Sequence, residues 1–364
     1  MLVRPAPHLI VMFIIVSSLF AILLILGFIE HYLHMKRINS VKTRILINGT
    51  RGKTTITRLL VSSLQSAGIK TIGRTTGSEA QMILPSGEIE EIKRRRPARV
   101  YELIKFWKRA EECGAECAVV ECMALQKENQ KAIRDTLVSP TSVVIANTFV
   151  DHVPEMGRSI ESTSEVLRMS IPKNAKLYVT EHLYDDFQNV TFVDAKSETS
   201  PREDIHPSAI AIVRAILKDL NINEEYLNEG IKNFIPDKGL LKPFNVGSSS
   251  LFIPSFSIND LSSMNSALSK WNRKVNLIYN NRKDREYRIS LFDDVLKNNR
   301  DIIDKVYVIG DYKNKVMRHF GKLADAHAIS IDDLKGVIDS SRCQVFIGLG
   351  NIKGEGEELI ALFE

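Results

Sequence analysis

The stretch Thr43–Thr55, TRILINGTRGKTT, joins a short apolar run to a glycine-rich loop and decides the fold. Thr43–Asn48 is rich in aliphatic residues and ends at a glycine, which is typical of a buried strand. Lys53–Ala67 then carries apolar residues at helical spacing, and Gly68 follows it, as at many helix ends. The stretch therefore predicts a strand, a short glycine-rich loop and a helix in direct succession.

The same alternation of strand and helix continues along the chain. It predicts a parallel α/β sheet, in two units. The Pro-, Gly- and Ser-rich segment 234–250 separates the two units. We expect an anchor over 1–35, a first α/β domain over 36–238 and a smaller Rossmann-like α/β domain over 239–364. The further strands and helices expected are Val100–Cys113 and Ser208–Leu220 as helices, and Cys117–Val120, Ser142–Ala146, Leu177–Thr180, Val275–Tyr279, Val306–Ile309 and Gln344–Gly348 as strands.

Composition excludes a disordered or collagen-like chain. The 364 residues are 44% hydrophobic and 26% charged, with a net charge of +5. Four cysteines, three of them within Cys113–Cys122, are too few and too unevenly spread for a disulfide framework, so we expect a reducing compartment. No histidine stands at zinc-finger spacing beside them, and small buried thiols are the expected interpretation.

An apolar segment precedes the first strand. Leu9–Ile29 holds no charged residue, and its insertion free energy sums to roughly −5 to −10 kcal/mol. A cleaved signal peptide is the alternative, but Glu30-His31-Tyr32 follows where small residues would be needed. Arg4 stands alone before the segment, and four cations follow it: Lys36, Arg37, Lys42 and Arg44. The positive-inside rule then predicts a retained single-pass anchor with the bulk of the chain in the cytoplasm.

The loop Gly49–Thr55 predicts a phosphate site. Its backbone N–H groups and the following helix N-terminus suit phosphate oxygens. Lys53 would reach the β- and γ-phosphates of ATP, and the Thr54 hydroxyl would ligate Mg²⁺. The full phosphate-loop pattern fails because Ile47 stands where its first glycine belongs, so the loop is a shortened version. The other loop residues expected at the nucleotide are Gly49, Thr50, Arg51, Gly52 and Thr55.

Two further residues stand where ligands gather in open α/β sheets. Glu121 ends the apolar strand before it, and Asp151-His152 follows the strand-like run Ser142–Phe149. Because the carboxyl ends of parallel strands form the binding edge, we expect Glu121 and His152 there either to hold a second metal or to orient the first. Taken alone, His152 is more simply a structural histidine.

These segments together resemble a known family. N-G-T-R-G-K-T-T (48–55), E-C-M-A (121–124) and D-H-V-P-E-M-G (151–157) resemble the ATPase core of Mur ligases and folylpolyglutamate synthase. The match is closer to the ligase subunit of poly-γ-glutamate synthases, which also has an N-terminal span. Five more elements of that family occur in order: G-R-T-T-G (73–77), I-K-R (92–94), N-D-x-S-S (259–263), N-x-R-x-D-R (280–285) and G-x-G-N-I-x-G (348–354).

The resemblance implies a Mur-ligase-like fold and an ATP- and Mg²⁺-dependent amide ligase that forms an acyl phosphate from glutamate. It also implies an anionic polyglutamate substrate, membrane subunits of a synthase complex and a possible homo-oligomer, without nucleic acid. The residues it implicates are Lys53, Arg282, Asp284 and Arg285 in catalysis; Asn147, Asn259 and Asp260 at the nucleotide; Thr54, Glu121 and His152 at metal; and Arg74, Thr75, Thr76, Lys93 and Arg94 at the substrate.

Three points stay open at this stage. Mur ligases commonly carry a carbamylated lysine where this chain has Val166, and Arg168 is the nearest cation. The run Lys93–Arg96 is either a solvated charge run or a path for a polymer of carboxylates. The alternatives to a polyglutamate ligase are another Mur-type amino acid ligase, or a switch or transport ATPase that forms no amide.

Overall fold

The decisive strand, loop and helix form as the sequence predicts. In the computed structural model, β1 (Thr43–Asn48) leads through the loop to α2 (Lys53–Ser66). The structure describes residues 7–77, 80–94, 99–202, 204–236, 243–256, 258 and 261–364. α2 begins after Gly52, whose φ of 77° no β-branched residue adopts without strain, and ends at Ala67, whose N–H bonds to Ser63 O.

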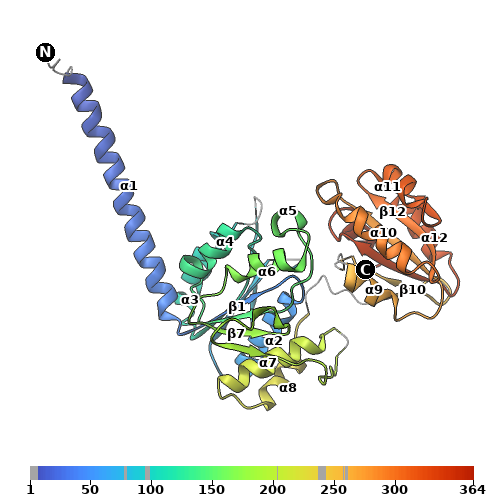
Figure 1. The fold of residues 1–364 in the computed structure, drawn as a ribbon, viewed down its shortest axis with the longest axis horizontal. Helices are drawn as coiled ribbons and strands as arrows, with labels where there is room; N and C mark the ends of the chain where they lie inside the picture. Colours follow the sequence, from blue (N-terminus) through green and yellow to red (C-terminus); the bar gives the residue numbers. More distant parts are fainter. Residues whose placement is uncertain are drawn as a thin grey trace. The chain divides into compact units, whose positions relative to one another are not determined.

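The contacts divide the chain into two units (Figure 1). Unit 1 comprises Met1–Thr76, Ala80–Thr148 and Ile160–Ile235, and unit 2 comprises Gly77–Glu79, Phe149–Ser159 and Pro236–Glu364. The predicted boundary after residue 238 falls within residues 237–242, outside the described part of the chain, and stays a prediction.

Unit 1 is built on a sheet with β1 in its middle. The strand order is β4-β3-β2-β5-β1-β6-β7-β8, and all neighbours from β2 to β8 run parallel. The remaining elements of unit 1 are β2 (Thr71–Thr75), β3 (Gln81–Ile83), β4 (Ile89–Glu91), α3 (Glu102–Glu112), β5 (Cys117–Glu121), α4 (Lys127–Ala132), the π-helix η1 (Ile133–Leu137), β6 (Ser142–Ile145), α6 (Ile160–Arg168), β7 (Lys176–Val179), η2 (His182–Tyr184), β8 (Val190–Phe192), α7 (Pro207–Asp219) and α8 (Glu225–Lys232).

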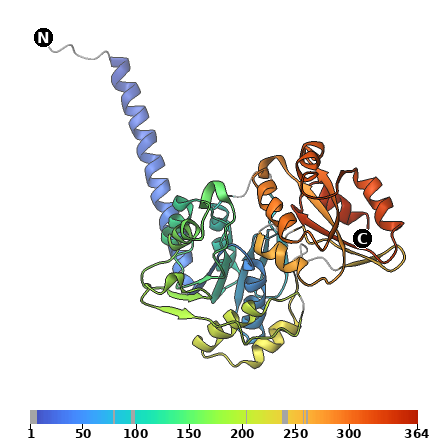
Figure 2. The ribbon, with the colours of Figure 1, turned by 45° about the vertical axis from the view of Figure 1, so that its right-hand side comes forward.

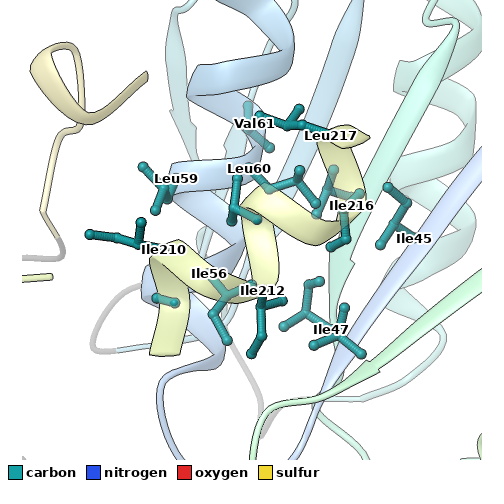
Figure 3. Close-up of a cluster of buried hydrophobic side chains, with 14 of the residues drawn as sticks. Ile45, Ile47, Ile56, Leu59, Leu60, Val61, Ile210, Ile212, Ile216 and Leu217 are labelled. Atoms are coloured by element: carbon teal, nitrogen blue, oxygen red, sulfur yellow. The ribbon is translucent and has the colours of Figure 1, made fainter. Parts of the chain in front are cut away.

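One face of this sheet carries the main core of unit 1. Side chains of α2 and α7 interdigitate over β1, as Figure 3 shows for Ile56 and Leu60 of α2, Ile212 of α7 and Ile47 of β1. Each of these side chains is at most 2% exposed, and burying one contributes about 1.5–3 kcal/mol relative to leaving it exposed. The core therefore fixes α2, and with it the loop at its N-terminus, against the centre of the sheet.

Unit 2 is a second, smaller α/β layer structure. Its strand order is β13-β12-β11-β14-β10-β9, parallel except for the antiparallel edge pair β9–β10. Its elements are α5 (Val153–Met156), β9 (Phe244–Val246), β10 (Ser250–Ile253), α9 (Leu261–Leu268), β11 (Val275–Asn281), η3 (Lys283–Arg285), α10 (Arg288–Asn298), β12 (Ile303–Gly310), α11 (Lys313–Phe320), β13 (Ala326–Ala328), α12 (Ile331–Asp339), β14 (Val345–Gly350) and α13 (Glu355–Ala361).

A long helix, α1 (Pro7–Ser40), precedes the first sheet and extends away from it (Figures 1 and 2). Among the described residues, Val11–Ser40 is the segment long and apolar enough to cross a membrane, and the window that qualifies it is unburied in the structure. The helix is longer than the predicted span Leu9–Ile29. It continues through Ser40 because its last turns pack against unit 1, where Ile38 is fully buried.

Candidate active site

The loop between β1 and α2 has a backbone that glycine makes possible. Gly49 has a φ of +116° and Gly52 a φ of +77°, both in the region that disfavours side chains. A Cβ on Gly49 would lie 2.9 Å from the Ala146 nitrogen, so the loop also packs too closely on the end of β6 for any side chain. A Cβ on Gly52 would meet nothing within 4 Å, so this side of the loop is open.

Asn147 braces this loop from behind. Its Oδ1 accepts hydrogen bonds from Thr50 Oγ1 (2.6 Å) and from the Arg51 N–H (2.9 Å), and its Nδ2 donates to Arg51 O (3.1 Å). Sequence reasoning placed Asn147 at the nucleotide itself, and a direct contact stays a prediction. The contacts give it a positioning role, because its amide is occupied by the loop.

Asn48, the first residue of the motif N-G-T-R-G-K-T-T, was given no role from the sequence, and it supports the loop from the strand. Its Oδ1 accepts from the Gly49 N–H (2.8 Å), and its Nδ2 donates to Gln130 Oε1 (3.0 Å) and Ser170 Oγ (2.9 Å). The side chain is 2% exposed and satisfied on both ends. The only sequence signal for this role is a polar residue that ends an otherwise apolar strand.

Lys53 lies over the loop. Its Nζ donates to Gly49 O (2.6 Å) and Thr50 O (3.2 Å), so the ammonium is held above the loop carbonyls at the N-terminus of α2. The positive charge and the helix N-terminus then attract anions to the same place.

Thr54 and Glu121 come together as the sequence predicts. Thr54 Oγ1 donates to Glu121 Oε2 at 3.0 Å, and the same oxygen accepts from the Thr76 N–H at 2.7 Å. Glu121 is 3% exposed, and it is the last residue of β5, opposite Ile47 of β1. Hydroxyl and carboxylate oxygens are the ligands that Mg²⁺ prefers.

This donor set fits a divalent cation held jointly with phosphate. No group of three or more His, Cys, Asp or Glu side chains that could hold a metal occurs among the described residues. Mg²⁺ usually keeps several waters and binds through one or two carboxylates plus substrate phosphates. The Thr54–Glu121 pair beside the loop has that character.

Arg74 and Arg94, both expected at the substrate, share a carboxylate. Arg74 Nη2 and Arg94 Nη2 lie 2.8 and 2.9 Å from Glu102 Oε2. Burial lowers the pKa of Arg74, whose side chain has no exposed surface, while Arg94 is partly exposed. Arg94 is therefore not a free member of a charge run, and a substrate role for either arginine stays a prediction, as it does for Lys93, Thr75 and Thr76. The rest of that run, 95–96, lies outside the described residues.

His152 does not stand at a strand end, and that part of the prediction is wrong. β6 ends at Ile145, because the chain then turns so that Asn147 can bond to the loop. His152 follows with a left-handed φ of 49° and belongs by its contacts to unit 2, whereas Glu121 belongs to unit 1. A metal role for His152 stays a prediction.

In unit 2, the predicted cluster after β11 contacts His152. Arg285 Nη1 donates to His152 Nδ1 (2.9 Å) and to the Tyr287 hydroxyl (3.1 Å). Because Nδ1 accepts this bond, the proton of a neutral His152 ring is on Nε2. Arg282 Nη2 pairs with Asp284 Oδ2 at 2.7 Å. Asn259 and Asp260 lie outside the described residues.

Asn280 and Asn351, which stand in two of the quoted motifs but were given no role, and Arg288 hold this end of unit 2 together. Asn280 Nδ2 donates to Asn351 O (2.5 Å), and Asn351 Nδ2 returns a bond to Asn280 O (3.0 Å). Arg288 Nη1 donates to Asn351 Oδ1 (2.6 Å), and its Nη2 lies 3.7 Å from Asp151 Oδ1. The asparagines join the carboxyl ends of β11 and β14, and their sequence signal is their place in the motifs N-x-R-x-D-R and G-x-G-N-I-x-G.

The structure also describes the position of the Mur ligase lysine, its nearest cation and the four cysteines. Val166, where Mur ligases carry lysine, is 2% exposed in α6. Arg168 pairs with Asp186 (2.7 Å) and lies over the Tyr184 ring, so its charge is already compensated. All four cysteines are free thiols; Cys117 and Cys122 are buried as expected, Cys113 is half-buried, and Cys343 is exposed.

Comparison with known proteins shows the family of the chain. Residues 241–364 match the family model for the C-terminal domain of the poly-γ-glutamate synthase CapB. The capsule biosynthesis protein CapB of Bacillus anthracis is 31% identical over 97% of this chain and 83% of its own length. The chain belongs to the CapB family. PGA synthase CapB of Bacillus subtilis (strain 168) is 29% identical over 93% of this chain and 95% of its own length.

Solved structures show that this chain has the fold of Mur ligases and folylpolyglutamate synthases. The bifunctional folylpolyglutamate synthase/dihydrofolate synthase of Yersinia pestis, complexed with AMPPNP and Mn ion, has a TM-score of 0.67 at 13% identity, over 92% of each chain. MurF of Acinetobacter baumannii has a TM-score of 0.66 at 15% identity, over 92% of this chain and 79% of its own. The family and fold class predicted from the motifs are confirmed.

Proposed function

We propose that the chain is an ATP-dependent amide ligase that makes poly-γ-glutamate. Membership of the CapB family, which includes the PGA synthase of Bacillus subtilis and the capsule biosynthesis protein of Bacillus anthracis, supports the product. The phosphate loop with Lys53 above it and the Thr54–Glu121 pair beside it supports ATP as the energy source. The loop geometry is the observation that carries the proposal.

The reaction needs two group transfers. A glutamate carboxylate oxygen attacks the γ-phosphorus of ATP, the bond to the β-phosphate oxygen breaks, and ADP leaves. The amine of another glutamate then attacks the acyl carbon, phosphate leaves with that carboxylate oxygen, and the amine loses a proton to form the amide. Overall, ATP, a carboxylate and an amine become ADP, phosphate and an amide.

The chain's own residues position and neutralise charge in the first transfer. The N-terminus of α2 would hold phosphate oxygens, and Asn48 and Asn147 fix the loop before it by accepting hydrogen bonds from the Gly49 and Arg51 N–H groups. Lys53 balances charge that develops on the transferred phosphoryl group. A divalent cation, which we propose to be Mg²⁺, would be held by Thr54 and Glu121 and would neutralise phosphate charge.

The remaining expectations from the sequence are part of this proposal. α1 would anchor the chain as a single-pass protein with both units in the cytoplasm, because basic residues follow its apolar stretch. The catalytic roles of Arg282, Asp284 and Arg285, the membrane subunits of a synthase complex and a homo-oligomer stay predictions.

The test uses full-length protein in membranes that also contain the partner subunits of the synthase. Labelled glutamate and ATP should yield ADP and an amide-linked glutamate polymer, identified by mass spectrometry. A different amide product would assign the chain to another Mur-type ligase. ATP hydrolysis without any new amide would leave only the switch or transport ATPase.

A further inference from the structure

The apolar part of α1 passes into the folded unit with almost no spacer. Ile29 and Leu33 are 51% and 40% exposed, but His34 is only 5% exposed and Ile38 is fully buried. His34 Nε2 bonds to the Thr136 carbonyl of η1 at 3.0 Å, and Arg37 Nε bonds to Glu111 of α3 at 2.9 Å. α1 is therefore packed into unit 1 only five residues after Ile29, which ends its uncharged stretch.

Helix geometry then fixes how far unit 1 stands from the bilayer. His34 follows Ile29 by five residues, which is about 7.5 Å along the helix. Each headgroup layer is about 5–8 Å thick, given a hydrocarbon core of about 30 Å within about 40–45 Å in all. If Ile29 ends the hydrocarbon, the contact with η1 lies at the outer boundary of the headgroups, and any tilt of the helix brings it closer.

The elements attached at this point present cations. α3 is tied to η1 by the bond from Trp107 Nε1 to Leu137 O (2.6 Å), and Figure 1 shows α3 beside the end of α1. Its buried face leaves Tyr101, 68% exposed, in line with Lys105 and Lys108 at helical spacing, both exposed. No ion pair among the described residues includes Lys105 or Lys108.

Lys36 of α1 adds to this surface. It is exposed, two residues beyond His34, and no ion pair among the residues with described side chains includes it. Helical side chains lean toward the N-terminus, which here is the side of the bilayer. A lysine at this position can extend its ammonium group toward the headgroups while its stem stays on the protein.

We propose that the surface formed by Tyr101, Lys105, Lys108 and Lys36 rests on the headgroups of anionic phospholipids. The proposal rests on the membrane anchor proposed above. It adds that this surface of unit 1 contacts the lipid headgroups, which we call the seated state, instead of being held away from them. Its basis is the short spacer together with charge complementarity. A lysine near an anionic membrane surface contributes about a fivefold shift in the ratio of seated to unseated protein.

The experiment places the full-length protein in lipid nanodiscs, either neutral or containing phosphatidylglycerol, with a nitroxide quencher on the headgroups. A fluorophore on Tyr101→Cys, in a Cys113→Ser/Cys343→Ser background, reports the surface without removing a lysine. Lys218→Cys on α7, whose buried residues belong to the core on the other face of the sheet, is the matched control position. We expect strong quenching at position 101, dependent on phosphatidylglycerol and weakened by 1 M salt, and little at position 218.

Charge variants complete the test. Lys105→Gln/Lys108→Gln should lower the seated-to-unseated ratio about 25-fold, and the matched pair Lys218→Gln/Lys232→Gln should leave it unchanged. Equal quenching at both labels, or quenching at position 101 that ignores anionic lipid, would overturn the proposal. So would a label at position 101 that responds to soluble polyglutamate in neutral nanodiscs but not to anionic lipid. Release of the protein by alkaline carbonate would refute the anchor itself, whereas polymer synthesis is not scored in any of these measurements.

Discussion

At the scale of single residues, Lys53 carries the sharpest prediction. Its Nζ is held over the loop by two carbonyls, so Lys53→Ala removes the charge placed for the transferred phosphoryl group. We expect polymer synthesis to fall on the order of a thousandfold, or about 4 kcal/mol of transition-state stabilisation. The exposed Lys70, after the same helix, gives the control Lys70→Ala. Near-normal synthesis by Lys53→Ala would remove Lys53 from the mechanism.

Glu121 tests the cation site. Glu121→Gln keeps an oxygen that can accept from the Thr76 N–H but loses the negative charge beside Thr54. The Mg²⁺ concentration for half-maximal ATP turnover should rise at least ten- to hundredfold, the range seen for even outer-shell residues of metal sites. Glu116→Gln, on the exposed end of the preceding turn, is the control. An unchanged Mg²⁺ titration in Glu121→Gln would place the cation elsewhere.

The two buried thiols predict a loss of stability in alkali. Burial raises the pKa of Cys117 to about 12 and that of Cys122 to about 11, from 9.0 when exposed. Below about pH 9 both thiols are protonated in the folded and unfolded chain, and they give no pH dependence. Above it, only the unfolded chain ionises, so the free energy of unfolding should fall from about pH 9 up to these raised values.

The measurement for the thiols is the urea midpoint at pH 8 and pH 10.5, under reducing conditions. Cys117→Ala/Cys122→Ala should lose part of the alkaline decrease that the unmodified chain shows, and Cys343→Ala, at an exposed thiol, should retain all of it. Identical slopes in all three proteins would mean that the thiols ionise as easily in the folded chain as in the unfolded one.

At the scale of secondary-structure elements, the contact between α2 and α8 depends on one missing side chain. A Cβ on Gly230 would lie 2.2 Å from Ser63 Oγ and 2.8 Å from the Ser63 backbone. The backbone cannot yield as a side chain can, so Gly230→Ala should destabilise unit 1 by about 1–3 kcal/mol. In α12, a Cβ on Gly336 would meet nothing within 4 Å. Gly336→Ala should stabilise unit 2 by about 0.4–1 kcal/mol.

Chemical denaturation of full-length protein in detergent, followed separately by probes in each unit, measures both effects. Because the two substitutions are chemically identical and differ only in the space around the new methyl group, opposite signs are the decisive result. Equal effects of the two substitutions would show that helix propensity, and not packing on Ser63, decides the outcome at Gly230.

The elements that sequence reasoning found are those with continuous apolar runs. β1, β5, β6 and β11 lie inside their sheets between parallel neighbours, where both faces are buried and each strand carries a run of apolar residues. β2 and β10 were missed, and so were the three-residue strands at or next to the sheet edges, β3, β4, β8, β9 and β13, since three residues with mixed polarity carry no such signal. The antiparallel pairing of β3, β4 and β9 was therefore not foreseen.

The sequence predicted those site residues whose chemical type and position beside a predicted strand both indicated a role. It predicted the other site residues less well. Thr54 and Glu121 were both expected at metal, and they lie in contact because the loop after β1 and the end of the neighbouring strand β5 meet at the same edge of the sheet. His152 was misplaced because Asn147 ends β6 early, and nothing in the apolar run SVVIANTF shows that an amide will turn toward the loop. Asn48 and Asn147 brace the loop by hydrogen bonds that only the folded sheet brings within reach.

At the scale of the whole molecule, the features of the chain point to one process. The CapB family relation indicates a glutamate polymer, the loop and the proposed cation site suit ATP, and α1 is long and apolar enough to cross a membrane. A polymer made by repeated addition of glutamate needs a new carboxylate to be activated for every bond. The central claim is that the ATP bound at the loop performs this activation by phosphorylating the carboxylate.

Isotope transfer tests that claim most directly. Glutamate labelled with ¹⁸O in its carboxylates is supplied with ATP to full-length protein in membranes with the partner subunits of the synthase, and the released phosphate is analysed by mass spectrometry. If an acyl phosphate forms and an amine displaces it, each amide bond made will release one phosphate that carries one ¹⁸O atom. Polymer formation accompanied by unlabelled phosphate would contradict the account, because the phosphoryl group would then have gone to water and never to glutamate.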